Sequence, residues 1–198
     1  MSIYQRSIGL TLLVLLFSGC GSDVSTPETN ADAPASVDFA DLEFSSPPVS
    51  HHDDGGRVQV ELSSAWNDDG RLIVRAVFSP DDSGFHLYDS ELPMTGVMGI
   101  GRPTLIEVGD DKGLAEVGAL VADKSALTHF DKAINAALSV YPDGPVTLYL
   151  PIRFESAPEG PTQLPIQVTY MSCSDQRCNV PVERAAQEIT ILAPSTTP

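Results

Sequence analysis

The sequence predicts a single all-β domain, an immunoglobulin-like β-sandwich with a short helical insertion. Short apolar runs of strand length recur along the chain, with turn-forming residues between them. Only one segment has the periodicity of a helix. The chain has 198 residues, and an N-terminal export segment leaves enough for one domain. We therefore expect the sandwich over residues 37–193 and a C-terminal tail over residues 194–198.

Residues 1–19 have the features of a bacterial lipoprotein signal peptide. Arg6 supplies a positive charge near the N-terminus, and an apolar run over residues 8–17 follows. The run is too short to cross a bilayer, which takes about 20 residues. Residues 16–20, Leu-Phe-Ser-Gly-Cys, then resemble a lipobox, in which Cys20 becomes the lipidated first residue after cleavage. An ordinary secretory signal that happens to contain a cysteine is the alternative.

Lipidation of Cys20 would tether the protein to a membrane without spanning it, because several acyl chains on one residue hold more firmly than a single chain. Residues 21–36 carry no large apolar residue apart from Val24, so we expect residues 20–36 to be the lipidated cysteine and a flexible tether. Gly21, in place of an aspartate, favours the outer membrane if the host is Gram-negative. The predicted location is the periplasmic side of the bacterial cell envelope.

The first two strands are predicted to form a hairpin. Val58–Ala65 alternates apolar and polar residues, Asn67–Gly70 supplies turn residues, and Leu72–Phe78 returns. Further segments with strand character are His86–Tyr88, Thr104–Val108, Val146–Phe154, Leu164–Tyr170 and Glu188–Leu192.

The one predicted helix lies between Asp123 and Val140. Its apolar residues fall on one face of a helical projection: Leu127, Phe130, Ile134, Ala137 and Leu138. Asp123 or Ser125 is suited to cap its start, and Pro-Asp-Gly-Pro at residues 142–145 ends it. We expect a helix over about residues 124–140, placed as a lid or crossover on the β body.

The charge balance argues against nucleic-acid binding. The chain has 11 Lys and Arg against 27 Asp and Glu; removal of Arg6 with the signal peptide leaves 11 − 1 = 10 against 27, a formal charge of −17. Affinity for a phosphate backbone rests on clustered basic residues, which this composition lacks. The acidity is suited to keeping the domain soluble and away from anionic membrane surfaces, so the lipid anchor is the expected membrane contact.

No metal or organic cofactor is predicted. The run His51-His52-Asp53-Asp54 contains ligand types, but adjacent residues of an extended chain point to opposite sides and two glycines follow, so a solvated loop is expected. A copper or zinc site made by Cys173, Cys178 and a histidine is a second alternative, and it needs thiolates and further ligands brought to one ion. Motifs for phosphate binding or serine hydrolysis are not evident.

Cys173 and Cys178 are the only cysteines left once Cys20 is lipidated. Apolar and β-branched residues lead into Cys173, four polar residues follow, and a second apolar run leaves after Cys178, which predicts two strands joined by a short loop. If the cysteines face each other in an antiparallel pair, their Cα atoms lie roughly 4.5–5.5 Å apart, within the range of a disulfide. An exported protein can keep such a bond.

Two interpretations of this disulfide stay open. Closing a loop of about six residues stabilises a fold by only about 2 kcal/mol, against about 4.7 kcal/mol for a hundred-residue loop. A domain of this length buries around two-thirds of its unfolded surface without covalent help. The weak structural gain favours a redox role, while a passive hairpin disulfide in an exported protein remains the alternative.

Two segments of the chain resemble one known family. The first is Tyr170-x-x-Cys173-x4-Cys178-x-x-Pro181-x-Glu183. The second is Gly84-Phe85-His86-Leu87-Tyr88, followed by Leu92-Pro93 and by Gly-Ile-Gly-Arg-Pro-Thr at residues 99–104. Together the matches span about residues 57–192, and they resemble the N-terminal periplasmic domain of the thiol:disulfide interchange protein DsbD.

The resemblance implies that Cys173 and Cys178 cycle between dithiol and disulfide. It further implies that Cys178 forms the mixed disulfide with a partner and that Cys173 resolves it. In that family the domain is fused to a membrane electron relay and a thioredoxin-like domain. A thioredoxin-like or other exported redox protein is therefore expected to act here in trans.

The resemblance also places an aromatic strand beside the cysteines. Strand alternation puts His86 and Tyr88 on one face and Phe85 on the other. The family implies that His86 and Tyr88 flank the cysteines, where an imidazolium would favour a thiolate and aromatic cover would limit access. The alternative from the residues alone is that the aromatic pair covers a sheet edge. A lipid-anchored immunoglobulin-like binding module with a purely structural disulfide is the competing function.

Overall fold

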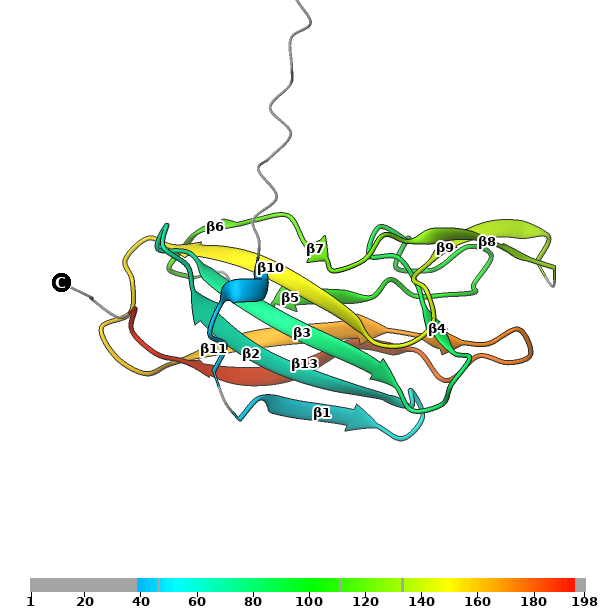
Figure 1. Cartoon of the computed structure of the whole chain (residues 1–198), viewed down its shortest axis with the longest axis horizontal. Coiled ribbons are helices and arrows are strands. Elements are labelled where there is room, and N and C mark those ends of the chain that lie inside the picture. Colours follow the sequence, from blue (N-terminus) through cyan, green and yellow to red (C-terminus); the bar gives the residue numbers. More distant parts are fainter. Residues whose placement is uncertain (1–38, 46, 111, 133, 195–198) are drawn as a thin grey trace, which may run out of the picture. The chain divides into compact units, whose positions relative to one another are not determined.

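Two antiparallel sheets enclose the hydrophobic core (Figure 1). The computed structural model describes residues 39–45, 47–110, 112–132 and 134–194. The predicted signal peptide over residues 1–19, Cys20, the tether over residues 21–36, and residues 195–198 of the tail lie outside these ranges. Within them, no helix has the length and apolar character needed to span a bilayer.

The larger sheet has six strands in the order β1-β2-β3-β10-β6, with β7 also paired to β10. The strand bounds are β1 Val49–Asp53, β2 Val58–Trp66, β3 Leu72–Pro80, β6 Leu114–Val117, β7 Val121–Ala122 and β10 Val146–Phe154. A short 3-10 turn, η1 Phe39–Asp41, precedes them. The predicted β2–β3 hairpin is confirmed, since Val58 pairs with Pro80 and Trp66 with Leu72.

The second sheet has three strands in the order β13-β11-β5. Their bounds are β5 Leu105–Val108, β11 Thr162–Tyr170 and β13 Val182–Ile191. Alternate residues of β10 are buried, Val146 and Leu148 among them, and they share one core cluster with Ile166 and Val168 of β11. Because strand side chains alternate between faces, each sheet turns one apolar face inward. The all-β, immunoglobulin-like sandwich predicted from the sequence is thus the fold of the described chain.

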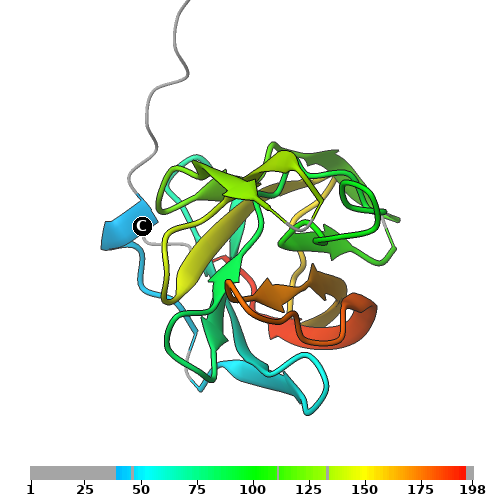
Figure 2. The same cartoon turned by 90° about the vertical axis from the view of Figure 1, so that its right-hand side faces the viewer.

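Two short ribbons extend from one end of this sandwich. One pairs β4 His86–Leu87 with β12 Ser172–Cys173, and the other pairs β8 Leu127–Asp131 with β9 Ala136–Val140. Figure 2 looks onto this end, which is the right-hand end of Figure 1. The candidate site is built from these two ribbons.

The predicted helix over residues 124–140 is wrong, because this segment forms the β8–β9 hairpin. Leu138 and Val140 are both buried, as expected for two positions on one face of a strand. Asn135 adopts a left-handed backbone conformation with φ of 50°, which asparagine tolerates well and which turns the chain back. Because the chain reverses here, the alternation of side chains in the first strand does not continue into the second. The combined spacing of the apolar residues therefore resembled one face of a helix.

The interpretation of residues 51–54 as a solvated loop is also wrong in part. His51, His52 and Asp53 belong to the edge strand β1, and Nε2 of His52 lies 3.0 Å from the Asp81 carboxylate. His51 instead contacts the Gln187 side chain through Nδ1 at 3.0 Å. The two imidazoles therefore have different protein partners. Among the described residues, no group of three or more His, Cys, Asp or Glu side chains is arranged to hold a metal ion.

Candidate functional site

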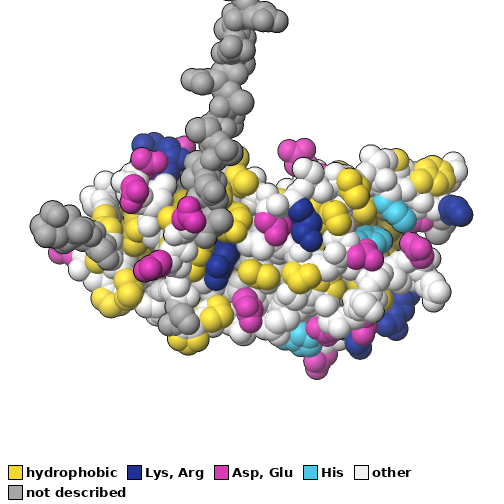
Figure 3. Space-filling view, in the orientation of Figure 1, with side chains coloured by type: hydrophobic (Ala, Val, Ile, Leu, Met, Phe, Trp, Pro, Cys, Tyr) yellow, Lys and Arg dark blue, Asp and Glu magenta, His cyan; other side chains and the backbone are white. Residues whose placement is uncertain are grey.

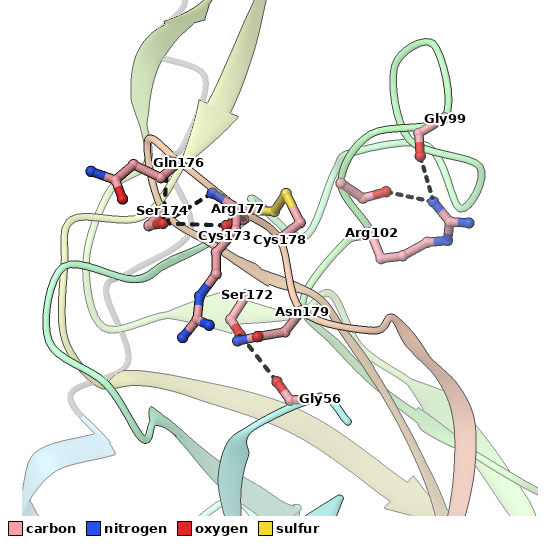
Figure 4. The surroundings of a disulfide bond; sticks show 11 residues. Gly56, Gly99, Arg102, Ser172, Cys173, Ser174, Gln176, Arg177, Cys178 and Asn179 are labelled. Carbon is pink, nitrogen blue, oxygen red and sulfur yellow. Dashed lines mark hydrogen bonds between the residues drawn. A yellow bond between two sulfur atoms is a disulfide. The ribbon is translucent and has the colours of Figure 1, made fainter. Parts of the chain in front are cut away.

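A disulfide joins Cys173 to Cys178 at the end of the β4–β12 ribbon (Figure 4). The two residues pair with each other as an antiparallel bridge, with Cα atoms 4.0 Å apart. This pairing confirms the expectation that they face each other across a short loop. Cys173 also lies directly opposite His86 in the strand register.

The loop between the cysteines is held by Ser174. The Ser174 backbone N–H donates to the Arg177 carbonyl oxygen at 2.8 Å. Its hydroxyl oxygen accepts from the backbone N–H groups of Gln176 and Arg177, each at 3.3 Å (Figure 4). Serine favours this kind of local turn because its side chain bonds the backbone two and three residues on. The loop thus returns the chain directly to Cys178.

Buried Ser172 attaches the disulfide to the sandwich. Its hydroxyl group donates to the Gly56 carbonyl oxygen at 3.1 Å and accepts from the Asn179 side-chain amide at 2.9 Å (Figure 4). Gly56 allows this approach because a Cβ there would lie 2.7 Å from Val182 and 2.8 Å from the Tyr170 ring. The position of the cysteines is therefore set by close packing at the end of β11.

The two cysteines differ in exposure. Cys173 is buried, with 2% of its surface exposed, whereas Cys178 is exposed to solvent. The difference follows from their positions, because Cys173 ends the paired strand β12 and Cys178 follows the exposed residues 175–177. Cys178 is therefore the more accessible of the two cysteines.

A cavity of about 360 Å³ lies beside the disulfide. It is lined by both cysteines, by His86 and Tyr88 of the aromatic strand, by Ser174 and Asp175 of the loop, and by residues 129–132 of the β8–β9 hairpin. Figure 3 shows histidine, acidic and basic side chains gathered at this end of the molecule. The sequence placed His86 and Tyr88 beside the cysteines by resemblance, and the structure brings all four residues to one cavity.

The cavity contains a pair of imidazoles. The ring centroid of His86 lies 5.3 Å from that of His129 and 5.4 Å from that of Tyr88. Burial lowers the pKa of His86 from its ordinary value, the neighbouring His129 lowers it further, and the carboxylates of Asp143, Asp175 and Asp131 partly oppose the shift. The lowered pKa favours the neutral imidazole of His86 over the imidazolium that the resemblance led us to consider.

Tyr88 supplies a neutral hydroxyl to the same cavity. It is almost fully buried, and its ring packs edge-on to that of His86. Burial raises the pKa of Tyr88 to about 12, and the charge of Asp131 adds to the shift. Its phenol therefore stays protonated across the physiological range and limits solvent access without adding charge.

Phe85 lies apart from His86 and Tyr88, beneath the cysteine loop. The Arg177 guanidinium lies 5.3 Å from the centroid of the Phe85 ring and 3.3 Å from the Asp82 carboxylate. Asp82 also pairs with Arg57 at 3.1 Å. The charge of Arg177 is thus directed to Asp82. These side chains are substantially exposed, so each ion pair contributes at most about 1 kcal/mol.

The β8–β9 hairpin supplies the site residues that sequence reasoning missed, namely His129, Phe130 and Asp131. Its base is fixed to the body, since the Ser139 hydroxyl donates to the Asp89 carboxylate at 2.8 Å and the Asp89 N–H donates to the Ser139 carbonyl at 3.0 Å. The residues were missed because the segment was interpreted as a helix. The asparagine turn before a pair of alternating buried residues was the available signal.

An ion pair joins the two segments on which the family resemblance was based. The Arg102 guanidinium donates to the Glu183 carboxylate. Arg102 also donates to the carbonyl oxygens of Gly101 at 2.8 Å and Gly99 at 3.4 Å (Figure 4). Arg102 thereby links the glycine-rich loop after the aromatic strand to the chain that leaves the cysteines.

Comparison with known proteins gives limited information. No family model matches the sequence, and no curated protein matches it. Among solved structures four chains match, and one is the N-terminal domain of DsbD from Neisseria meningitidis in its reduced form. That match has a TM-score of 0.39 and 17% sequence identity, and it covers 62% of this chain and 78% of the other. The chain is thus similar in part to a DsbD N-terminal domain.

Proposed function

We propose that this domain exchanges thiols and disulfides with other exported proteins through Cys173 and Cys178. One observation carries the proposal: the disulfide closes a short loop beside a cavity, with Cys178 exposed and Cys173 buried. An exchange protein needs one sulfur that a partner can reach and a second that attacks only after the partner is bound. A structural disulfide needs no such difference.

The exchange proceeds in two steps with balanced electrons. In the first, the Cys178 thiolate attacks one sulfur of a partner disulfide, and the partner's other sulfur leaves as a thiolate. In the second, Cys173 attacks the Cys178 sulfur, and the partner's remaining sulfur leaves. The pair is oxidised to the disulfide described above, and the partner gains two electrons and two protons. The reverse sequence would oxidise a dithiol partner.

The surrounding fold supports a redox role over a structural one. The main core between the two sheets includes neither cysteine, whereas Cys173 packs in a smaller buried cluster with Tyr88, Leu138, Val140 and Met171. Ser172, Gly56 and Asn179 already fix the start and end of the loop through hydrogen bonds. A bond that closes so short a loop adds only about 2 kcal/mol to such a domain.

The proposal extends to location and partner. Lipidation at Cys20 would hold the domain on the periplasmic side of the cell envelope, at the outer membrane in a Gram-negative host. A thioredoxin-like or other exported redox protein would then act in trans. Radiolabelled fatty acid incorporated into the wild-type chain and absent from a Cys20→Ala variant would support the anchor, and equal labelling of both would contradict it.

The exchange function is tested by the redox equilibrium of the cysteine pair. The processed chain is equilibrated with a thioredoxin-like protein of known potential, and the oxidised fraction of each is measured. We expect exchange, with a potential above about −300 mV. A potential far below that value and no exchange would place the bond among inert structural disulfides, and would favour the binding-module alternative.

A further inference from the structure

The resolving step poses a proton problem, because Cys173 must lose its thiol proton to attack Cys178. The thiolate is the reactive form of cysteine, and burial in a protein disfavours that charged form. Cys173 is buried at the inner end of the loop, whereas Cys178 has direct access to solvent. A proton acceptor beside Cys173 would overcome this difficulty.

His86 occupies the position of such an acceptor. It lies directly opposite Cys173 in the antiparallel β4–β12 pair. Side chains of directly opposite residues share one face of the ribbon, with Cβ atoms about 4.5–5.5 Å apart. Both side chains line the same cavity, and both are buried, His86 with 8% of its surface exposed. This register thus places the His86 imidazole on the same face of the ribbon as the Cys173 side chain, beside the same cavity.

The groups that face His86 keep it able to accept a proton. Across the cavity, His129 opposes a second positive charge, and the phenol of Tyr88 stays neutral. The carboxylates of Asp131, Asp143 and Asp175 come from the hairpin, the turn after β9 and the cysteine loop, and they favour the imidazolium once it forms. Lys132, which follows Asp131 in the chain, is the cationic side chain among the residues that line the same cavity. Burial and His129 together leave the resting imidazole uncharged.

We propose that His86 is the general base of the resolving step. This role rests on the exchange function proposed above. A ring nitrogen of His86 takes the Cys173 thiol proton as the Cys173 sulfur attacks the Cys178 sulfur. The bond between Cys178 and the partner breaks, and the partner sulfur leaves with the electron pair. The proton then passes from His86 to that thiolate or to water, which restores the neutral imidazole.

The test separates the two steps with a small disulfide, 5,5′-dithiobis(2-nitrobenzoate). The reduced, processed chain is mixed with this reagent, and release of coloured thionitrobenzoate is followed by stopped flow. The first equivalent reports attack by Cys178, and the second reports attack by Cys173 on the Cys178 mixed disulfide. A Cys173→Ser variant identifies the phases, because it can release only the first equivalent.

His86→Gln should slow the second phase at pH 7 by tenfold or more, since general bases typically contribute about 10²–10⁴-fold. The first phase should stay within about twofold of the wild-type rate. Added imidazole should partly restore the second phase. The matched control is His52→Gln, which removes a histidine that pairs with Asp81 outside the cavity and should leave both phases unchanged.

The wild-type pH profile gives a test that needs no substituted chain. Base catalysis by His86 predicts that the second phase rises with a midpoint below about pH 6.5, the ordinary histidine value, and is flat through the range in which a cysteine thiol titrates. A second phase that instead rises through about pH 8.5, the ordinary value for a cysteine thiol, would overturn the role of His86. So would a His86→Gln chain with unchanged second-phase rates. Release of only one equivalent by the wild-type chain would contradict the exchange function itself.

Discussion

Gly56 shows how a single residue without a side chain positions the disulfide. Its carbonyl oxygen accepts a hydrogen bond from the Ser172 hydroxyl, and a Cβ at this position would meet Tyr170 and Val182. We predict that Gly56→Ala destabilises the fold by about 1–3 kcal/mol, because the added Cβ would overlap both side chains. Urea unfolding measures the change. The control is Gly160→Ala, where a Cβ meets no atom within 4 Å; equal losses in both variants would contradict the packing explanation.

Asp82 forms an ion pair with Arg177, the residue that precedes Cys178 in the chain. Asp82→Asn should free the guanidinium to favour the Cys178 thiolate, and we expect alkylation of reduced Cys178 by iodoacetamide to accelerate by about twofold at pH 7. The effect is small because the pair is exposed and screened by solvent. Asp81→Asn is the control, since Asp81 pairs with His52. A slower reaction in Asp82→Asn would refute the claim that Asp82 draws the Arg177 guanidinium away from Cys178.

His86 also couples folding to pH. Its pKa in the folded chain lies below its ordinary value of 6.5, so the unfolded chain binds more protons between the two values. Stability should therefore be fully present above about pH 6.5 and should fall as the pH drops below it. Thermal unfolding between pH 8 and pH 5.5 measures the slope, and His86→Gln should flatten it. His51, whose pKa burial also lowers, accounts for part of the slope that remains. An unchanged slope in His86→Gln would contradict this assignment.

At the scale of elements, strand alternation predicted most of the sandwich. Val146–Phe154 matches β10 at both ends because its buried positions alternate. The β8–β9 hairpin was mistaken for a helix. Four apolar residues on its two strands, together with Ile134 in the turn, happen to fit a period of 3.6 residues. The short strands β6 and β7 were missed for a different reason. Their pairing with β10 is a tertiary contact, and their own sequences alternate only weakly.

Some residues of the candidate site were predictable from local sequence motifs, and others were not. Cys173, Cys178, His86 and Tyr88 came from local motifs, and the structure brings them to one cavity. His129 and Phe130 belong to an element more than forty residues before the cysteines in sequence, so only the folded chain brings them there. Phe85 carried the same motif signal as its neighbours but lies under Arg177, because alternation turns it to the opposite face.

The hairpin tip should limit access to the disulfide. Phe130 lines the cavity and is 56% exposed, so Phe130→Ala should leave stability within about 0.5 kcal/mol and speed reduction by dithiothreitol several-fold. Leu127→Ala is the matched control, because Leu127 is similarly exposed on the same hairpin and does not line this cavity. Reduction rates that do not differ between the two variants would show that Phe130 gives no shielding.

In the whole molecule, the main hydrophobic core and the disulfide site occupy different regions. The main core lies between the two sheets, and the disulfide and its cavity lie at the β4–β12 and β8–β9 ribbons, which extend from one end of the sandwich in Figure 1. The double variant Cys173→Ser with Cys178→Ser should therefore keep the fold with a loss of about 2 kcal/mol, measured by denaturant unfolding. Loss of exchange with the fold intact is the expected outcome. A much larger loss of stability would make the disulfide a structural part of the domain.

Trapping of mixed disulfides by single-cysteine variants tests most directly whether Cys178 attacks a partner and Cys173 resolves the intermediate. Cys173→Ser and Cys178→Ser chains are expressed in the native envelope, thiols are quenched with acid, and mixed disulfides are separated without reductant. Cys173→Ser should accumulate mixed disulfides through exposed Cys178, because the thiol that resolves them is gone. Cys178→Ser should trap little, because its remaining thiol is buried. Equal trapping by both variants would contradict the assigned roles, and no trapping by either, under conditions that capture known oxidoreductases, would contradict the exchange function.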